Sequence, residues 1–180
     1  MIFEKLPLEG LVLITPEIFN DARGYFFESY NKDAFFKNGI DIDFAQDNQS
    51  LSFKNALRGL HFQNPPYEQG KLVRVICGSV NDVVVDIRKT SPDYGKHFSI
   101  ILSSKENKML WIPPGFAHGF ATLEDNTIFS YKCTKVYNKE SESGIIFNDE
   151  SLGIDWSITN PVISDKDMEL KKMSQADIRF

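Results

Sequence analysis

The chain has 180 residues, a length that predicts a single domain spanning residues 1–180. Its apolar fraction of 42% and charged fraction of 25% are those of an ordinary globular protein, which excludes a disordered or fibrous chain. The net charge of −5 leaves no basic stripe and argues against nucleic-acid binding, whereas a small anionic ligand needs only a few local arginines.

The N-terminal segment and the lack of long apolar runs make the cytoplasm the expected location. The N-terminal segment MIFEKLPLEG lacks a cationic stretch followed by a long apolar one, so we expect no signal peptide. The apolar runs fall far short of the ~20 residues that a membrane helix needs. Cys77 and Cys133 lie far apart in strand-like runs, and we expect both to be buried free thiols.

Short apolar and aromatic runs recur along the chain and are separated by turn signals such as NPPYEQG and TSPDYG. In chain order we expect strands at 11–15, 24–30, 42–50, 57–63, 71–78, 80–87, 96–102, 108–113, 119–123 and 127–133. Helix is sparse, with a short one expected at 31–39 and another in the tail at 164–175. Many short strands with few helices predict an all-β sandwich or barrel.

The tail helix carries a start signal, because Ser164 and Asp167 resemble a capping box. The strand at 80–87 has an apolar face with Val83 and Val85, which we expect to be core. Its other face carries Asp82 and Asp86, which suits either solvent or a polar cavity such as that of a jelly-roll barrel.

The three histidines are His61, His97 and His118, and no H-x-H pair exists anywhere. A metal-binding cupin would need such a pair together with a glutamate and a further histidine, so we predict no metal site. His61, in RGLH, is instead a candidate general base, because imidazole is suited to proton transfer near neutral pH. A half-exposed histidine satisfied by a backbone carbonyl remains the alternative.

Other polar residues are ambiguous when taken singly. Lys71 begins a strand after a turn, where a lysine without a functional role would simply be solvated. Tyr131 and Tyr137 flank a strand end, where tyrosines usually pack. Asp167 would favour a helix N-terminus without any further role, and Arg23 would suit a turn.

Eight ordered blocks, however, closely resemble the dTDP-4-dehydrorhamnose 3,5-epimerase family from about residue 8 to 170. They are DARGYFFESYN (21–31), FAQDNQS (44–50), LRGLHFQ (57–63), QGKLVRV (69–75), VVVDIRKTSPDYG (83–95), LWIPPGFAHGF (110–120), YKCTKVYNKESE (131–142) and SDKD (164–167). The resemblance implies a metal-free, cofactor-free enzyme with a cupin-like jelly-roll β-barrel and a few short helices. It also implies a homodimer in which the N-terminal segment reaches the neighbour's site.

The resemblance also implies roles. It makes His61 the base, Asp167 its carboxylate partner, Tyr131 the general acid and Lys71 the lysine near the sugar ketone, while Tyr137 stacks on thymine. The remaining nucleotide-sugar contacts that it implies are Arg23, Glu28, Gln46, Asp47, Asn48, Arg58, His118, Glu142 and Lys166. Departures from the family pattern at Gln49, Asp93 and Asn138 remove no catalytic group.

The implied reaction converts dTDP-4-dehydro-6-deoxy-D-glucose to dTDP-4-dehydro-L-rhamnose, a step of deoxysugar and rhamnose biosynthesis. The ketone at carbon 4 acidifies the protons on carbons 3 and 5, so inversion needs a base and an acid on opposite faces of the ring and a stabilised enolate between them. Three alternatives stay open: an epimerase acting at one carbon, a non-catalytic cupin that binds a sugar nucleotide, and a metal-dependent cupin.

Strand parity creates one conflict with these roles. On a regular strand Arg58 and His61 face opposite sides, yet both are assigned to one pocket. We therefore predict that Gly59 breaks the alternation, either by a bulge or because the strand begins after it.

Overall fold

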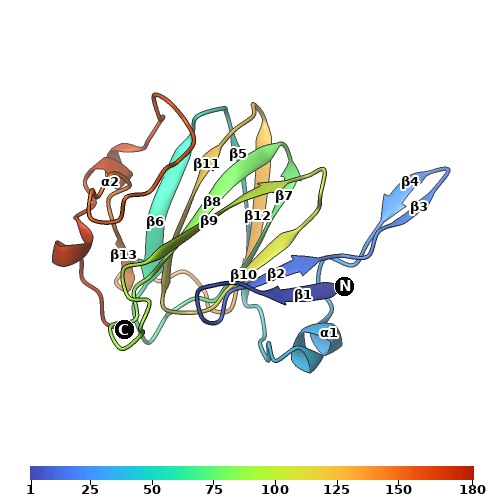
Figure 1. Ribbon diagram of the computed structural model, residues 1–180, viewed down its shortest axis with the longest axis horizontal. Helices are drawn as coiled ribbons and strands as arrows, with labels where there is room; N and C mark the ends of the chain where they lie inside the picture. The colour runs from blue at the N-terminus through green and yellow to red at the C-terminus, as the bar shows by residue number, and fades with distance from the viewer.

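The computed structural model describes residues 1–180, which form two facing antiparallel sheets (Figure 1). The first sheet contains, in spatial order, β1 (Ile2–Lys5), β2 (Val12–Thr15), β10 (Met109–Ile112), β7 (Lys71–Cys77), β12 (Thr127–Cys133) and β5 (Gln46–Ser52). The second contains β13 (Glu142–Gly144), β6 (Leu57–Gln63), β11 (Phe116–Thr122), β8 (Ser79–Asp86) and β9 (His97–Ser103). The predicted all-β jelly roll is confirmed.

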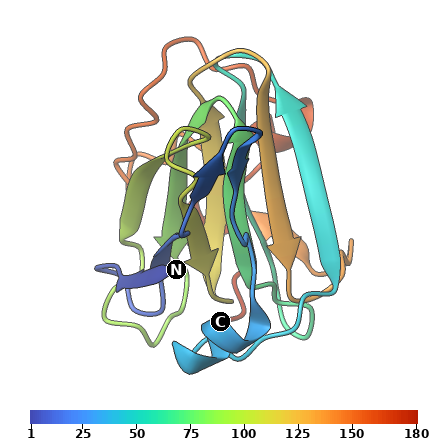
Figure 2. The same cartoon turned by 90° about the vertical axis from the view of Figure 1, so that its right-hand side faces the viewer.

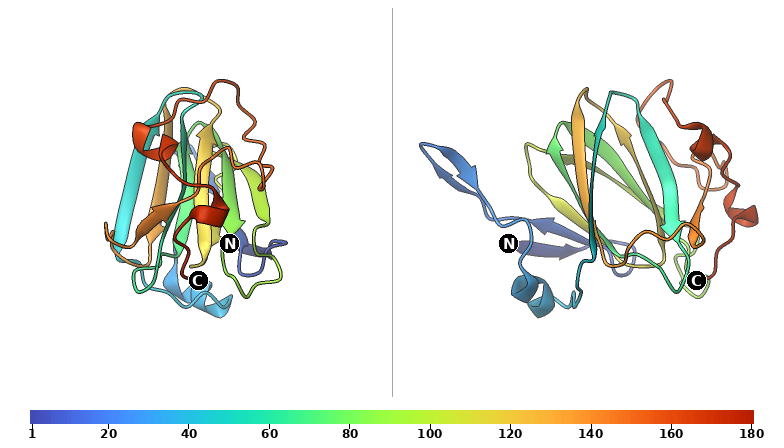
Figure 3. Two further views of the ribbon diagram at one scale, coloured as in Figure 1. Left: turned by 90° about the vertical axis from the view of Figure 1, so that its left-hand side faces the viewer. Right: turned by 180° about the vertical axis from the view of Figure 1, so that it is seen from behind.

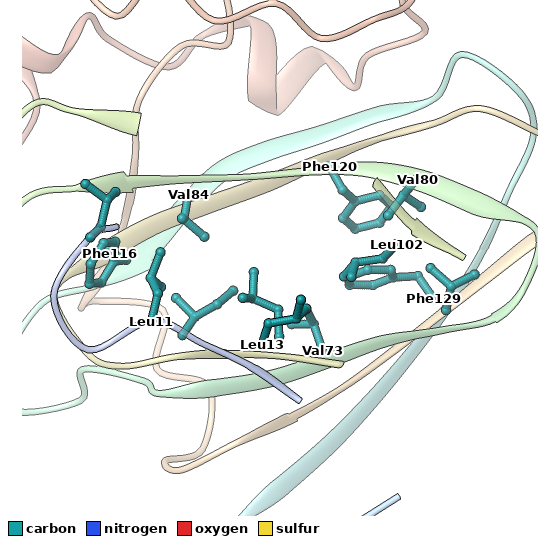
Figure 4. Packing of buried hydrophobic residues seen from close by; sticks show 13 residues of the cluster. Leu11, Leu13, Val73, Val80, Val84, Leu102, Phe116, Phe120 and Phe129 are labelled. Carbon is teal, nitrogen blue, oxygen red and sulfur yellow. The ribbon is translucent and has the colours of Figure 1, made fainter. Parts of the chain in front are cut away.

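The space between the sheets is filled by apolar side chains from both inner faces (Figure 4). Phe129 of the first sheet stacks on Phe120 of the second, with ring centroids 4.1 Å apart. Inward and outward residues alternate along each strand, so one apolar stripe per strand is enough to build this core. Toward the edge formed by β5 and β6 the filling becomes polar, and there the sandwich opens into a cavity.

A second core lies on the outer face of the second sheet, where the C-terminal segment covers it (Figure 3). This segment includes α2 (Asp165–Met168) and a 3-10 helix at Met173–Gln175, two short elements in place of the one tail helix expected. Val83 and Val85 pack here, so their predicted core face is confirmed. Asp82 points between the sheets and is fully buried, so its face of β8 is turned to the interior of the sandwich and not to solvent.

A third cluster covers part of the outer face of the first sheet. Phe35 of α1 (Lys32–Lys37) is fully buried there against Trp111 and Met109. The rest of that face is open, and beyond it projects the hairpin of β3 (Phe19–Asp21) and β4 (Gly24–Phe26), which points toward the viewer in Figure 2. The strand expected at 24–30 therefore ends at Phe26, because the chain turns back there toward α1.

Two further expectations are tested by burial and helix length. Cys133 is a buried free thiol as predicted, but Cys77 is exposed, because it ends β7 just before the turn at Gly78. None of the helices is long and apolar enough to cross a membrane.

Candidate active site

Gly59 produces a β-bulge in β6. His61 is paired with His118 of β11 and Arg58 with Phe120, so three steps along β6 match two steps along β11. The extra residue restores Arg58 and His61 to the same face, and both line the same cavity. The prediction that Gly59 breaks the alternation is confirmed, in the form of a bulge.

Only glycine fits this bulge. Its φ is +125°, and a Cβ atom built there would lie 2.5 Å from the Cα of Gly119 in the neighbouring strand. We expect Gly59→Ala to lower the free energy of unfolding by about 3 kcal/mol, because backbone strain and a backbone clash add.

Denaturant unfolding monitored by circular dichroism measures this loss, with Gly153→Ala as the matched control. Gly153 also has a positive φ, +60°, but no atom within 4 Å of a built Cβ, so its replacement is expected to cost only about 1–2 kcal/mol. Equal losses in the two variants would show that the close approach to Gly119 is unimportant.

Two adjacent cavities open at the edge between β5 and β6. The larger, about 870 Å³, extends from His61 toward Arg58 and the C-terminal segment; the smaller, about 380 Å³, extends toward Tyr137. Four side chains line both cavities: Asn48, His61, Lys71 and Tyr131. Three of the four predicted catalytic residues thus stand where the cavities meet.

His61 forms a pair with Asp167 of α2. The Nε2 atom of His61 lies 2.8 Å from Oδ1 of Asp167, and the other carboxylate oxygen accepts a hydrogen bond from the backbone N–H of Gly59. Burial alone would raise the pKa of Asp167, but the hydrogen bond with His61 holds that pKa below its usual value. An ionised Asp167 accepts a hydrogen bond from the N–H group at Nε2, which leaves Nδ1 of His61 as the atom able to take a proton from a ligand.

The predicted helix start at Ser164 is confirmed. Ser164 is the N-cap of α2, and its side chain accepts a hydrogen bond from the backbone N–H of Asp167. The carboxylate of Asp167, however, does not return to the cap and is turned to His61 instead. The bridge between Ala56 and Val162 brings the segment that precedes α2 beside the start of β6.

Tyr131 lies on β12, in the sheet opposite β6, so its phenol reaches the junction of the cavities from the wall facing His61. Burial raises the pKa of Tyr131, which keeps the hydroxyl protonated at neutral pH. Such a group can donate a proton but is a poor base under the same conditions.

Lys71 begins β7 and is 9% exposed. Its Nζ atom donates one long hydrogen bond, 3.5 Å, to the backbone oxygen of His61, and no carboxylate is within ion-pair distance. Burial lowers the pKa of Lys71. A negative charge that develops on a ligand beside it would therefore be strongly stabilised by the ammonium form.

At the end of the smaller cavity, Tyr137 and Glu142 interact with Lys166, which itself lines the larger cavity. Glu142 accepts hydrogen bonds from the hydroxyl of Tyr137 at 2.8 Å and from the ammonium of Lys166 at 2.7 Å. Burial alone would raise the pKa of Glu142, but these two donors hold it below its usual value. Gln46 accepts a hydrogen bond from the backbone N–H of Tyr137 and fixes this end of the cavity.

Three predicted contacts lie elsewhere in the chain. Arg23 is on the projecting hairpin and pairs with Asp21, Glu28 follows the hairpin and accepts a hydrogen bond from Asn31, and Asp47 pairs with Lys132 on the outer face of the first sheet. None of these three lines either cavity of its own chain. The reason for Asp47 is strand parity, since its neighbours Gln46 and Asn48 point inward.

His118 is inside the larger cavity and bonded to a carboxylate that the sequence reasoning did not assign to it. Its Nε2 atom lies 3.1 and 3.0 Å from the two oxygens of Asp82. The parity of the strand at 80–87 was the available signal, because it placed Asp82 on a face suited to a polar cavity. No group of three or more metal-ligating side chains gathers anywhere in the structure.

Comparison with known proteins decides the family. The family model for dTDP-4-dehydrorhamnose 3,5-epimerase matches residues 5–175. The chain belongs to the dTDP-4-dehydrorhamnose 3,5-epimerase family. An epimerase of that name from Shigella flexneri is 47% identical over 174 residues, which cover 96% of each chain.

Solved structures agree with the fold of this epimerase family member. The crystal structure of the dTDP-4-dehydrorhamnose 3,5-epimerase from Elizabethkingia anophelis superposes with a TM-score of 0.94 at 41% identity and covers 99% of each chain. The dTDP-6-deoxy-D-glucose-3,5-epimerase from Legionella pneumophila, solved in complex with dTDP-4-keto-L-rhamnose, has a TM-score of 0.93 at 43% identity and covers 97% of this chain and 93% of that one.

Proposed function

We propose that this chain catalyses the epimerisation of dTDP-4-dehydro-6-deoxy-D-glucose at carbons 3 and 5, giving dTDP-4-dehydro-L-rhamnose. The observation that carries the proposal is the placement of His61 and Tyr131 on opposite sheets at the junction of two cavities. Inversion at carbon requires removal of a proton from one face and delivery to the other, and these two walls supply the base and the acid.

The substrate divides between the two cavities. Tyr137, at the end of the smaller one, is 52% exposed and offers a flat ring for the thymine, where base stacking contributes about 1–3 kcal/mol. The hexose then lies at the junction and extends into the larger cavity. Arg58 lines the larger cavity and has no carboxylate partner within the chain. Its Nε–H donates to the hydroxyl of Ser52, which leaves the terminal N–H groups of the guanidinium to bind oxygens of the sugar part of the substrate.

The reaction then follows from the chain's own groups. Nδ1 of His61 takes the proton from carbon 3 or carbon 5, and the electron pair of the C–H bond moves onto the ketone oxygen. Lys71 stabilises the resulting enolate, and the hydroxyl of Tyr131 protonates the same carbon from the opposite face. The imidazolium of His61 then releases its proton to solvent and the phenolate of Tyr131 takes one up, which restores both groups for the second carbon. Asp167 keeps the imidazole in the required tautomer and stabilises the imidazolium.

Turnover in D₂O tests the proposal. We expect deuterium at both carbon 3 and carbon 5 of the product, read by ¹H NMR as the loss of both ring-proton signals. Deuterium at one carbon alone would identify an epimerase for a single position, and unchanged substrate would point to a binding protein without turnover.

We further propose that two copies associate through the open face of the first sheet, with each hairpin lying over the other copy's cavity. Large apolar side chains are exposed on this side, among them Phe19, Phe26, Leu51 and Ile76. A soluble protein rarely leaves so many unburied without a partner surface. The arrangement also explains why Arg23 lies outside its own chain's cavity, since it would serve the neighbouring site.

Mixing two inactive variants tests this arrangement. In a mixed dimer of Arg23→Ala and His61→Ala chains, one site carries both defects and the other carries neither. Random exchange of subunits is therefore expected to restore about a quarter of the wild-type rate, because half of the dimers are mixed and each has one intact site. If Arg23 serves its own chain, mixing restores no activity; sedimentation equilibrium gives the dimer mass independently.

A further inference from the structure

Asp82 is a buried carboxylate whose presence the stability of the core does not explain. It is fully buried on β8, with Val80 and Val84 of the inter-sheet core as its neighbours on the same face. A carboxylate in such surroundings costs several kcal/mol, and an apolar side chain of similar size would usually be more stable. No lysine or arginine pairs with it.

Both carboxylate oxygens of Asp82 have the same single hydrogen-bond partner, the imidazole of His118. Nε2 of His118 lies 3.1 Å from Oδ1 and 3.0 Å from Oδ2, and no other hydrogen bond to the carboxylate is formed within the chain. Because an ionised carboxylate can only accept, Nε2 of His118 must carry the proton that is shared with it. The ring nitrogen that remains free is Nδ1, which in the neutral imidazole is an acceptor.

The ring of His118 has little freedom to move. It is 6% exposed and stacks on Phe129 at a centroid distance of 6.1 Å and an interplanar angle of 23°. Phe120 lies on β11 two residues away, with its centroid 6.4 Å from that of His118. Asp82 and the two aromatic rings therefore hold both the orientation and the tautomer of His118.

His118 faces the larger cavity and does not line the smaller one. In the ladder between β6 and β11 it is the direct partner of His61, so two carboxylate-held imidazoles stand side by side on the wall of the hexose cavity. They differ in accessibility, since the side chain of His61 is 33% exposed and that of His118 only 6%. The exposed ring suits proton transfer and the enclosed one suits fixed recognition.

We propose that Asp82 is a positioning residue that holds His118 in the Nε2-protonated tautomer, so that Nδ1 accepts a hydrogen bond from a hydroxyl group of the hexose. This inference rests on the proposed function, because it assumes that the larger cavity takes the hexose of a dTDP-sugar. It predicts that Asp82 affects recognition of the sugar and not of the nucleotide.

Calorimetric titration with two stable probes, dTDP and dTDP-glucose, separates recognition of the nucleotide from recognition of the sugar. In Asp82→Asn the amide can either accept from Nε2 or donate to it, so the tautomer is no longer imposed. We expect the affinity for dTDP-glucose to fall about three- to tenfold, the equivalent of one hydrogen bond, and that for dTDP to stay unchanged. Equal losses for both probes, or no loss for either, would overturn the proposal.

Asp86→Asn is the matched control. Asp86 is on the same face of β8 and equally buried, but it accepts hydrogen bonds from Arg88 and Ser91 and lines neither cavity. Its replacement is expected to lower the melting temperature and to leave the ratio of the two affinities unchanged. If the ratio of the affinities for dTDP-glucose and dTDP changed in this variant, loss of any buried acid of β8 would affect the sugar site. Asp82 would then have no specific role.

Imidazole ¹H–¹⁵N correlation spectra test the tautomer in the wild-type protein, independently of how any variant folds. The chain has three histidines, so His118 is readily assigned. We expect a protonated Nε2 and a bare Nδ1 whose resonance shifts with dTDP-glucose and not with dTDP. A protonated Nδ1 at neutral pH would overturn the inference alone, whereas a wild-type protein that bound neither probe would overturn the proposed function.

Discussion

His61→Ala is expected to lower kcat between about a hundredfold and ten-thousandfold while the affinity for dTDP stays close to that of the wild type. The imidazole is the only group at the junction of the cavities that is paired with a carboxylate and partly exposed, so no other side chain can replace it as the base. Product formation at saturating substrate measures the first quantity, and calorimetric titration with dTDP measures the second.

Two companion variants make the result specific. Asp167→Asn retains the shape of the partner but no longer imposes the tautomer of His61, and a large loss of kcat is expected there too. His97→Ala removes a histidine on β9 that lines neither cavity and is expected to be neutral. Unchanged turnover in His61→Ala would exclude His61 as the base.

Tyr131→Phe is expected to separate proton exchange from inversion. The base on the opposite sheet can still remove the proton and return a deuteron from D₂O to the same face, but no hydroxyl remains to protonate the other face. We expect product formation to fall at least about a hundredfold, with deuterium still entering the substrate. ¹H NMR of the substrate pool and of the product in one reaction measures both rates.

The control for this variant is Tyr94→Phe, which removes a hydroxyl from an exposed tyrosine outside both cavities and is expected to change neither rate. Loss of exchange together with loss of product in Tyr131→Phe would mean that the phenol takes part in enolate formation itself. Full retention of product would exclude Tyr131 as the acid.

The bulge at Gly59 shows how far local reasoning reaches. The identities of Arg58, Gly59 and His61, with the alternation of a strand, were enough to predict that the chain departs from a regular strand there. They could not choose between a bulge and a later strand start. That choice came from β11, because His118 and Phe120 pair with residues three apart on β6 and the backbone of Gly119 fills the space beside Gly59.

The pair of Asp82 and His118 shows where local reasoning stops. Strand parity placed Asp82 on the face that suits solvent or a polar cavity. No local pattern between residues 82 and 118, however, predicts that β8 and β11 are neighbours. Their register brings the carboxylate diagonally beside the imidazole. The same limit applies to Asp47, whose outward direction depends on where β5 begins, and to Cys77, whose exposure depends on a turn.

By itself the sequence determined the all-β class, most of the strands and the family, and it predicted which residues carry the chemistry, because these inferences depend on residue identity and on short periodicities. The tertiary structure decided which sheet carries each residue and hence which groups face one another. It set His61 and Tyr131 on opposite walls, turned Asp167 toward His61, gave His118 its carboxylate and left Arg23 outside its own chain's cavity. Those placements depend on pairing between strands and segments far apart in the chain, which no local pattern encodes.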